Sequence, residues 1–454
     1  MSAGGALLAA LLYPGVPLFW SVWFTLTLVI VIYQFCWKIF LFRRSRRWQK
    51  RLLALGRDEG GEASRDQFYW VFMVPALNEE VTIIDSIERL EQIEAKYKRI
   101  IVIDDGSEDQ TSELLAAQNR PNLQVVSRLL PDAQKGKAAA LNAGFIDLLK
   151  TVEELGWPRE RVIVTIVDAD GRIDADGPRY VGQHFEDPRV GGVQMLVRIY
   201  NLRGALTWAQ NREFKTFGYL YQAARSSWGG AYMGGNGQMN RLTALEQVAT
   251  PEGPWRDRLT EDQDIGLRLL ANGWLGRQEL RAQISQQGLN SLRALIRQRV
   301  RWSMGNLQTL SMTGALVRGK IPLVGRAEIV NFLFMPFMQA VAGVASLGAL
   351  YVLVSGSVEL IPNGETSEAA IVVATAYILS VGGVVLASLA DAHHRGPVAY
   401  LRSFAEANLF IIYTWLMWPV LMIASYRILR HQTGWAKTDR ESLEPPSSAT
   451  PSSR

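Results

Sequence analysis

The chain has 454 residues, of which 48% are hydrophobic and 20% charged, with a formal net charge of +5. That charge is small for the length, and the basic residues gather at the edges of apolar segments, so the composition argues against a nucleic-acid partner. The single cysteine, Cys36, cannot form a disulfide within the chain, and the four histidines lack the spacing of a zinc site.

Apolar segments divide the chain. Four of them are long enough, or nearly so, to cross about 30 Å of hydrocarbon as a helix. They are residues 16–41, 329–354, 368–390 and 408–425. The first is too long for a signal peptide, and its charges follow it rather than precede it. We therefore expect five regions: an N-terminal transmembrane segment at 1–42, a soluble domain at 43–287, interfacial helices at 288–326, a C-terminal transmembrane region of about three spans at 327–428, and a polar tail at 429–454.

The charges beside these segments predict the orientation in the membrane. The run "RRSRRWQKR", residues 43–51, carries six Lys or Arg, and the positive-inside rule puts it and the soluble domain in the cytoplasm. The same run suits contact with lipid headgroups. Three later spans would put the tail outside, whereas its basic residues favour the inside. An interfacial or re-entrant piece at 4–13 or 397–428 would alter that count, so the side of the C-terminus stays open. The end of the tail is rich in Pro and Ser and is expected to be disordered.

Between the membrane segments, apolar runs alternate with helical patterns. The runs "FYWVFMVPALNEE", "RIIVIDDGSEDQT", "NLQVVSRLL" and "RVIVTIVDADG" predict strands, and helical patterns lie at 81–94 and 135–150. This rhythm predicts an α/β domain with a parallel sheet, whose ligands bind at the carboxyl ends of the strands. Three of those ends carry acids. Any one could be a cap or a turn, but three together favour a site. Dinucleotide and Walker motifs are missing, which argues against a dehydrogenase or an ATPase.

Two aspartates, Asp168 and Asp170, close the fourth predicted strand. Side chains at i and i+2 of a strand share a face, so both carboxylates can point the same way. They suit a hard cation, Mg²⁺ or Mn²⁺, that also binds a diphosphate. An EF-hand loop counted from Asp168 fails, because Arg172 and Ile173 stand where it needs an acid or amide and a glycine. Alone, a D-x-D pair is weak evidence.

A third acidic group lies in "RLTEDQDIGLRLLANGW", residues 258–274, where a helix is predicted to begin. Carboxylates suit a helix N-terminus through the helix dipole, which is a purely structural explanation for Glu261 and Asp264. A general base must lie close to the hydroxyl that it deprotonates. One acid of this group, separate from the metal pair, could serve as that base.

The segment "ALIRQRVRWSMGNLQTLSM", residues 294–312, predicts an amphipathic helix with arginines between its apolar positions. Such helices lie in the membrane interface, where Trp302 would be an anchor. In the alternative, Arg301 pairs with a diphosphate and Trp302 stacks on a sugar. Composition alone favours the anchor.

Taken in order, these motifs resemble those of membrane-embedded family 2 glycosyltransferases of the processive type. The matching pieces, within residues 74–302, are "VPALNEE", "VIDDGSEDQT", "KGKAAALN", "VDADG", "GGNGQMNR", "LTEDQDIGLRL" and "QRVRW". Together they resemble the signature of cellulose, hyaluronan, chitin-oligosaccharide and poly-N-acetylglucosamine synthases. The resemblance implies an α/β domain of GT-A type inserted between transmembrane helices, with amphipathic interface helices.

The resemblance also implies residue roles. The donor, a UDP-sugar, would be bound by Glu79, Asp105, Lys137, Asp168 and Arg301. Asp168 and Asp170 would hold Mg²⁺ or Mn²⁺ on its diphosphate, and Asp262 would be the general base. The acceptor would contact Gln298, Trp302, Asn236 and Gln238. The last two lie in a glycine-rich stretch, 229–241, that departs from the motifs cellulose and hyaluronan synthases carry there.

The resemblance further implies an inverting enzyme that polymerises a β-linked polysaccharide at the cytoplasmic face of the plasma membrane and secretes it through its own spans. Its partners would be the UDP-sugar, the growing glycan and the bilayer, and accessory secretion subunits are compatible with this reading. A non-processive transferase that adds one sugar to a membrane lipid is the alternative. An inactive transferase domain in a transport or scaffold protein is disfavoured, since every expected acid is present.

Overall fold

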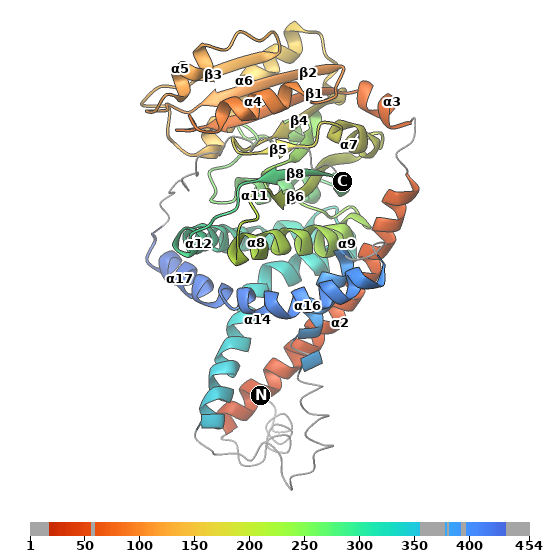
Figure 1. Cartoon of the computed structure of the whole chain (residues 1–454), viewed down its shortest axis with the longest axis vertical. Coiled ribbons are helices and arrows are strands. Elements are labelled where there is room, and N and C mark those ends of the chain that lie inside the picture. The colour runs from red at the N-terminus through yellow and green to blue at the C-terminus, as the bar shows by residue number, and fades with distance from the viewer. Residues whose placement is uncertain (1–17, 56–59, 355–376, 379–380, 392–395, 433–454) are drawn as a thin grey trace, which may run out of the picture.

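The computed structural model describes residues 18–55, 60–354, 377–378, 381–391 and 396–432. An α/β domain occupies one end of the molecule, and long helices extend from its other side (Figure 1). Part of the predicted span at 368–390, residues 368–376 and 379–380, and the tail after 432 lie outside the described residues.

The domain is built on one mixed sheet of eight strands, in the order β3-β2-β1-β4-β7-β6-β8-β5. The strands are β1 (Tyr69–Ala76), β2 (Tyr97–Asp104), β3 (Leu123–Ser127), β4 (Val162–Ile166), β5 (Arg172–Ile173), β6 (Val190–Ile199), β7 (Gln238–Arg241) and β8 (Leu275–Gln286). The four predicted strands, β1 to β4, pair in parallel. The prediction of a wholly parallel sheet is wrong, because β7 runs antiparallel to both β4 and β6.

Helices cover both faces of the sheet and extend beyond it. They are α2 (Leu18–Ala54), α3 (Gly60–Asp66), α4 (Ile83–Glu91), α5 (Thr111–Ala116), α6 (Lys137–Glu154), α7 (Gly177–Phe185), α8 (Ala205–Thr216), α9 (Ala223–Ser226), α10 (Leu242–Val248), α11 (Glu261–Ala271), α12 (Leu292–Gln308), α13 (Thr313–Arg318), α14 (Leu323–Val354), α16 (Pro397–Thr414) and α17 (Met417–Leu429), with a π-helical turn η2 (Phe217–Gln222) and short 3₁₀ turns η1 (Arg159–Arg161) and η3 (Thr309–Met312).

Burial on two faces explains why β1 reads as one continuous apolar run. Trp70 and Phe72 point into the core beneath α4 and α7, whereas Val71 and Met73 point into the core beneath α6 and α10. A strand with helices on both sides needs apolar side chains at every position rather than at alternate ones. The carboxyl ends of β1, β2 and β4 therefore open at one edge, where the acidic loops follow them.

Within the described part of the chain, three helices are long and apolar enough to cross a membrane: Leu18–Ala54, Leu323–Ala345 and Pro397–Leu429. One is N-terminal and two are C-terminal. The first runs past the predicted boundary at 42, because its last turns dock on the α/β domain. Trp48 Nε1 donates to the carbonyl of Gln278 at 2.9 Å, and the Trp48 ring stacks on His184.

The contacts of α2 give the direction of its neighbours. In α14, Asn331 accepts from Gln34 at 2.9 Å, and Gly348 lies against the ring of Trp20, so α14 runs antiparallel to α2. In the shorter apolar helix Val381–Asp391, Gly382 lies against Phe35, and the carbonyl of Ala390 accepts from Gln49 at 3.2 Å. This helix runs parallel to α2. Helix α2 thus runs towards the α/β domain, α14 runs away from it, and the helix Val381–Asp391 runs towards it again.

The last two helices lie differently from α2 and α14. In Figure 1, α16 and α17 run across the axis along which α2 and the far end of α14 extend, directly beneath the row formed by α12 and α8. Phe410 and Tyr413 of α16 pack with Ala209 and Leu295, and Val420 of α17 packs with its neighbours on α12. The predicted span at 408–425 is therefore apolar, but it is broken at Trp415 and lies alongside the domain.

A buried ion pair joins the domain to α14. Arg225 Nη2 lies 2.8 Å from Glu328 Oε1, and both side chains are almost wholly buried. The rings of Tyr232 and Phe332 surround the guanidinium at 4.5 and 5.0 Å. Glu328 also accepts a hydrogen bond from the indole of Trp37 on α2. The pair thus ties α2 and α14 to the domain.

Candidate active site

A cavity of about 520 Å³ opens at the carboxyl edge of the parallel strands. Its walls come from the loops after β1, β2 and β4, the start of α6 and α11, and one side of α12. On the side of α14 and α17 it is lined by Phe332, Met335 and Met417. One end of the cavity is therefore acidic and polar, and the other is apolar.

The acids after β1 and β2 line the polar end. Glu79 is held by its backbone N–H, which donates to Thr111 Oγ1 at 2.8 Å, and by Thr82, which donates to its Oε2 at 2.9 Å. Of the two adjacent aspartates, Asp104 accepts from Ser107 N and Ser112 Oγ and shapes the loop. Asp105 faces the cavity instead and accepts from Arg128. Burial raises the pKa of Asp105, and the Arg128 guanidinium opposes that rise.

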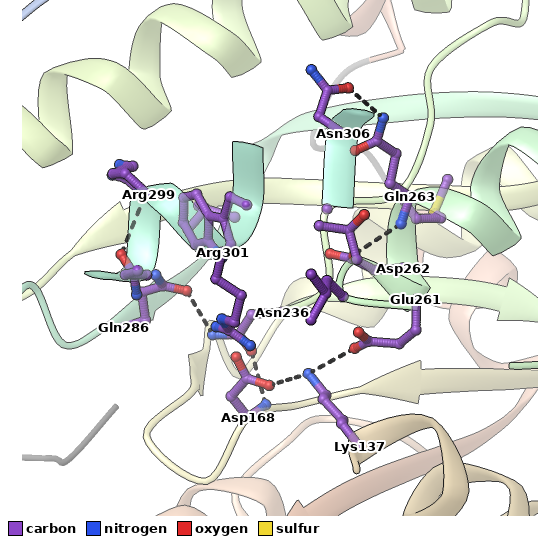
Figure 2. Close-up of a pocket in the computed structure, with 18 of the residues that line it drawn as sticks. Lys137, Asp168, Asn236, Glu261, Asp262, Gln263, Gln286, Arg299, Arg301 and Asn306 are labelled. Atoms are coloured by element: carbon purple, nitrogen blue, oxygen red, sulfur yellow. Dashed lines mark hydrogen bonds and ion pairs between the residues drawn. The ribbon is translucent and has the colours of Figure 1, made fainter. Parts of the chain in front are cut away.

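Lys137 lies between two carboxylates that also line the cavity (Figure 2). Its Nζ is 2.6 Å from Asp168 Oδ1 and 3.6 Å from Glu261 Oε1. Burial disfavours the lysine charge, but the two carboxylates outweigh burial and hold the pKa of Lys137 above its ordinary value. The ammonium therefore stays charged, as a group that faces an anionic ligand must be.

The two aspartates of "DADG" lie beyond the end of β4, so the prediction that they close a strand is wrong. Strand β4 ends at Ile166, and Asp168 begins a turn in which its carbonyl accepts from Gly171 N at 2.7 Å. Asp168 lines the cavity. Asp170 is 4% exposed and does not line the cavity; its Oδ2 accepts from Gln287 N at 2.9 Å. A turn has no period of two, which is why the strand argument failed here.

The donor set nevertheless fits a divalent cation of the predicted kind. Among the described residues, no group of three or more His, Cys, Asp or Glu is placed to hold an ion. Mg²⁺ in nucleotide sites needs only one or two carboxylates, since phosphate oxygens and water complete its shell. Asp168, about a quarter exposed in the cavity, is the carboxylate available for that role.

Asp262 lies at the start of α11, above Lys137 and Glu261 in Figure 2. Its Oδ1 accepts from Gln263 N at 2.8 Å, and the side chain lines the cavity. Burial and the neighbouring Glu261 carboxylate raise the pKa of Asp262 to about 7, against the opposing charge of Lys137. A carboxylate with that pKa can take a proton near neutral pH. The start of α11 is fixed by Gln263, whose amide donates to Asn306 of α12 at 3.0 Å.

The motif "QRVRW" forms part of α12, and three of its predicted residues reach the cavity: Gln298, Arg301 and Trp302. Arg301 extends from α12 towards the side where Asp168 lies (Figure 2). Trp302 lines the cavity, as the alternative to the membrane anchor requires. Its ring lies against the cavity, 4.1 Å from the guanidinium carbon of Arg299 and edge-on to Phe214 at 6.2 Å. Helices α16 and α17 cover the side of α12 that the prediction exposed to lipid.

The two predicted residues of the glycine-rich stretch have other surroundings. Asn236 lines the cavity next to Asp168, accepting from Asp168 N at 3.0 Å and donating to Gln286 at 3.1 Å, so it holds the turn that carries Asp168. Gln238 is buried in β7 and does not line the cavity. Nothing in its position supports contact with an acceptor.

Several lining residues were missed by the sequence reasoning. They are Glu213 and Phe214 of α8, Phe217 of η2, Tyr232, Gln286 and Arg299. The segment that forms α8 and η2 carries no recognisable motif, and the choice between Arg299 and Arg301 depends on the rotation of α12. Only the proximity of Arg299 to the "QRVRW" motif could have indicated one of them.

Comparisons with known proteins identify the family. The family model "Glycosyl transferase family group 2" matches residues 163–429, and "Glycosyl transferase family 2" matches residues 71–248. The chain is 28% identical over 295 residues to beta-monoglucosyldiacylglycerol synthase of Synechocystis sp., covering 63% of this chain and 58% of that protein. It is 28% identical over 242 residues to poly-beta-1,6-N-acetyl-D-glucosamine synthase of Staphylococcus aureus, covering 53% and 55%. The chain thus spans little more than half the length of these relatives.

A solved structure supports the fold. The mannosyltransferase PcManGT from Pyrobaculum calidifontis, in complex with GDP-Man and Mn²⁺, superposes with a TM-score of 0.53 and 18% identity, over 85% of this chain and 98% of that chain. Similarity at that identity shows the fold alone, a GT-A-like α/β fold with a mixed sheet. Together with a family model that matches more than half of the chain, the site identifies this protein as a glycosyltransferase that belongs to the glycosyl transferase family group 2.

Proposed function

We propose that the protein is an inverting, processive glycosyltransferase that builds a β-linked polysaccharide from a UDP-sugar at the cytoplasmic face of the plasma membrane. The observation that carries the chemistry is the position of Asp262. Its carboxylate, with a pKa of about 7, lines the same cavity as the cationic Lys137 and Arg301 and the ring of Trp302.

In the proposed step, the Asp262 carboxylate takes the proton of an acceptor hydroxyl. The acceptor oxygen then attacks the anomeric carbon of the donor, and the bond between that carbon and the diphosphate oxygen breaks. The nucleoside diphosphate leaves with the electron pair, and the configuration inverts in this single displacement. Lys137 and Arg301 suit binding of the diphosphate, because both are cations that line the cavity beside Asp168.

Asp168 would hold Mg²⁺ or Mn²⁺, which when bound would neutralise charge on the leaving diphosphate. Asn236 and Asp170 keep the turn of Asp168 in place. Glu79 and Asp105 lie at the end of the cavity furthest from the membrane helices and are proposed to bind the nucleoside. Trp302 and Gln298 are proposed to meet the acceptor sugar, since a tryptophan ring offers an apolar face to the C–H side of a sugar ring.

A second candidate function is transfer of a single sugar to a membrane lipid. It is favoured by the apolar end of the cavity, where Phe332, Met335 and Met417 come from candidate membrane helices. The two relatives support one candidate function each: the Synechocystis protein is named as a glycolipid synthase, and the Staphylococcus aureus protein as a polysaccharide synthase.

We further propose that α2, α14 and the segment that includes Val381–Asp391 cross the membrane, while α16 and α17 lie in its cytoplasmic interface. The alternating directions of the first three helices support this path, as do the exposed apolar side chains Leu401, Ile412 and Met422 on α16 and α17. The exposed cations Arg43, Arg47 and Lys50 lie on one side of α2, where they would meet lipid headgroups. The tail would then be cytoplasmic, as its charges favour.

One experiment tests these functions together. Purified protein in lipid nanodiscs is incubated with Mn²⁺ or Mg²⁺ and a panel of UDP-sugars, and UDP release is measured. Products are sized and digested with linkage-specific glycosidases. A polymer or ladder supports the processive enzyme, a single-sugar lipid supports the second candidate, and absence of UDP release with every sugar overturns the UDP-sugar assignment.

A further inference from the structure

The ring of Trp302 is fixed by two neighbours that also line the cavity. The Arg299 guanidinium lies over it, with 4.1 Å from the guanidinium carbon to the ring centroid, and Phe214 meets it edge-on with an interplanar angle of 67°. Arg299 is only 3% exposed although it carries a full charge. A buried guanidinium needs an anionic partner to offset the cost of its burial, and the position of that partner fixes the position of the guanidinium.

Arg299, Glu213 and Tyr413 are joined by three hydrogen bonds, and each residue comes from a different helix. Arg299 Nη2 donates to Glu213 Oε2 at 2.6 Å, and the Tyr413 hydroxyl donates to the same oxygen at 2.7 Å. Arg299 Nη2 also lies 3.4 Å from the Tyr413 hydroxyl. Glu213 belongs to α8, Arg299 to α12 and Tyr413 to α16. Tyr413 does not line the cavity, so it acts on the site only through the other two.

Arg299 differs in its surroundings from the two neighbouring arginines of α12. Arg297 is exposed on the same helix, and Arg301 points into the cavity. Arg299 alone of these three arginines combines burial, a carboxylate partner and stacking on Trp302. Because a planar guanidinium both stacks and makes directed hydrogen bonds, a lysine cannot replace it at this position.

We propose that Glu213, Arg299 and Tyr413 form a positioning network that holds the Trp302 ring as the acceptor platform, so that α16 controls how well the acceptor competes with water. This inference rests on the proposed role of Trp302 at the acceptor. The network does not touch the donor-binding residues Asp105 or Asp168. Its loss should therefore affect the acceptor and leave the donor unaffected.

The test uses the full chain in nanodiscs, with the variants Tyr413→Phe and Arg299→Lys. Matched controls are Tyr426→Phe, an exposed tyrosine on α17, and Arg297→Lys, an exposed arginine two residues from Arg299. UDP-glucose and UDP-N-acetylglucosamine are the donor probes, and N-acetylglucosamine oligosaccharides and diacylglycerol are the acceptor probes. The readouts are the KM for the acceptor, kcat, the ratio of transfer to hydrolysis, and the Kd for UDP.

We expect Tyr413→Phe to raise the acceptor KM by about tenfold, because it removes a hydrogen bond to a charged group. Arg299→Lys should have a larger effect and shift the balance from transfer towards hydrolysis. The Kd for UDP should stay unchanged in both. A ¹⁹F spectrum of 5-fluorotryptophan-labelled protein, with the Trp302 signal assigned by Trp302→Phe, should show that signal move in Tyr413→Phe but not in Tyr426→Phe.

Two results would overturn the proposal. In one, Tyr413→Phe behaves like Tyr426→Phe in both the acceptor KM and the Trp302 signal. In the other, the variants weaken UDP binding and acceptor use equally while their thermal stability falls, which indicates a purely structural role. Should Arg299→Lys fail to fold, Tyr413→Phe decides alone. Failure of the proposed function looks different, since the unmodified protein then releases no UDP, whereas the ¹⁹F signal still reports on the network.

Discussion

The Oδ2 atom of Asp262 lies against the backbone of Gly235, where an added Cβ would come within 2.7 Å of that oxygen. Gly235 also has a φ of +82°, in the left-handed region that glycine tolerates best. The catalytic carboxylate that we propose is therefore positioned by the absence of a side chain opposite it.

Gly235→Ala should displace the Asp262 carboxylate and lower kcat by about a hundredfold, because small misplacements of a reacting group are costly. The Kd for UDP should change little. Steady-state kinetics and UDP titration measure both. Gly204→Ala is the control, since a Cβ there meets no atom within 4 Å. Equal kcat in the two variants would remove Asp262 from the proposed role.

The transfer rate should depend on pH through Asp262. Its pKa is raised to about 7, first by burial and then by Glu261, and the base must be ionised to accept a proton. The rate should therefore rise with pH up to about 7 and then level off. Glu261→Gln removes a neighbouring negative charge, lowers the pKa of Asp262 and should shift the acidic limb to lower pH. The pH profile of kcat shows the shift. Glu153→Gln, an exposed carboxylate on α6, should leave the limb in place, and a limb that ignores Glu261→Gln contradicts the assignment.

The two aspartates of "DADG" should differ in their effect on the metal requirement. Asp168→Asn should raise the Mn²⁺ concentration that gives half-maximal activity by at least about tenfold, since it weakens the one carboxylate of this pair that lines the cavity. Asp170→Asn keeps an oxygen for the Gln287 N–H and should leave that concentration close to its unmodified value. Activity titrated with Mn²⁺ distinguishes them. An equal shift in both variants would show that the pair binds the metal together.

The C-terminal tail should lie on the same side of the membrane as the α/β domain, because α16 and α17 do not cross in our proposal. In a Cys36→Ser background, Lys437→Cys should react with a membrane-impermeant maleimide in inverted vesicles but not in intact cells. Glu153→Cys, in the α/β domain, is the reference for the cytoplasmic side. Labelling of Lys437→Cys in intact cells would instead show that α16 and α17 form a further span.

The predictable part of the fold is the part with strong local patterns. Strands β1, β2 and β4 are buried apolar runs, and the acids at their ends were found because those ends meet at one edge of the sheet. In contrast, β7 has the sequence "QMNR", and all four residues are buried although three are polar. No local pattern indicates a buried strand of that kind; the neighbours β4 and β6 impose it.

Within the site, it was easier to predict which residues take part than which way their side chains point. Asp105, Lys137 and Asp262 line the cavity as expected. The different surroundings of Asp168 and Asp170 depend on where β4 ends, and strand ends are poorly marked in sequence. Trp302 turned inwards because α16 and α17 cover α12, a tertiary contact between segments about a hundred residues apart that composition cannot reveal.

The ion pair between Arg225 and Glu328 makes the α/β domain inseparable from α14. A fragment excised before Leu323 would retain a guanidinium surrounded by Tyr232 and other rings of the domain, without its counter-charge. Loss of one partner of a buried pair costs about 3–5 kcal/mol, a large part of the stability of most domains. The catalytic unit of this enzyme is therefore larger than its sheet and loops, and a water-soluble version will need a substitute for Glu328 as well as a new surface.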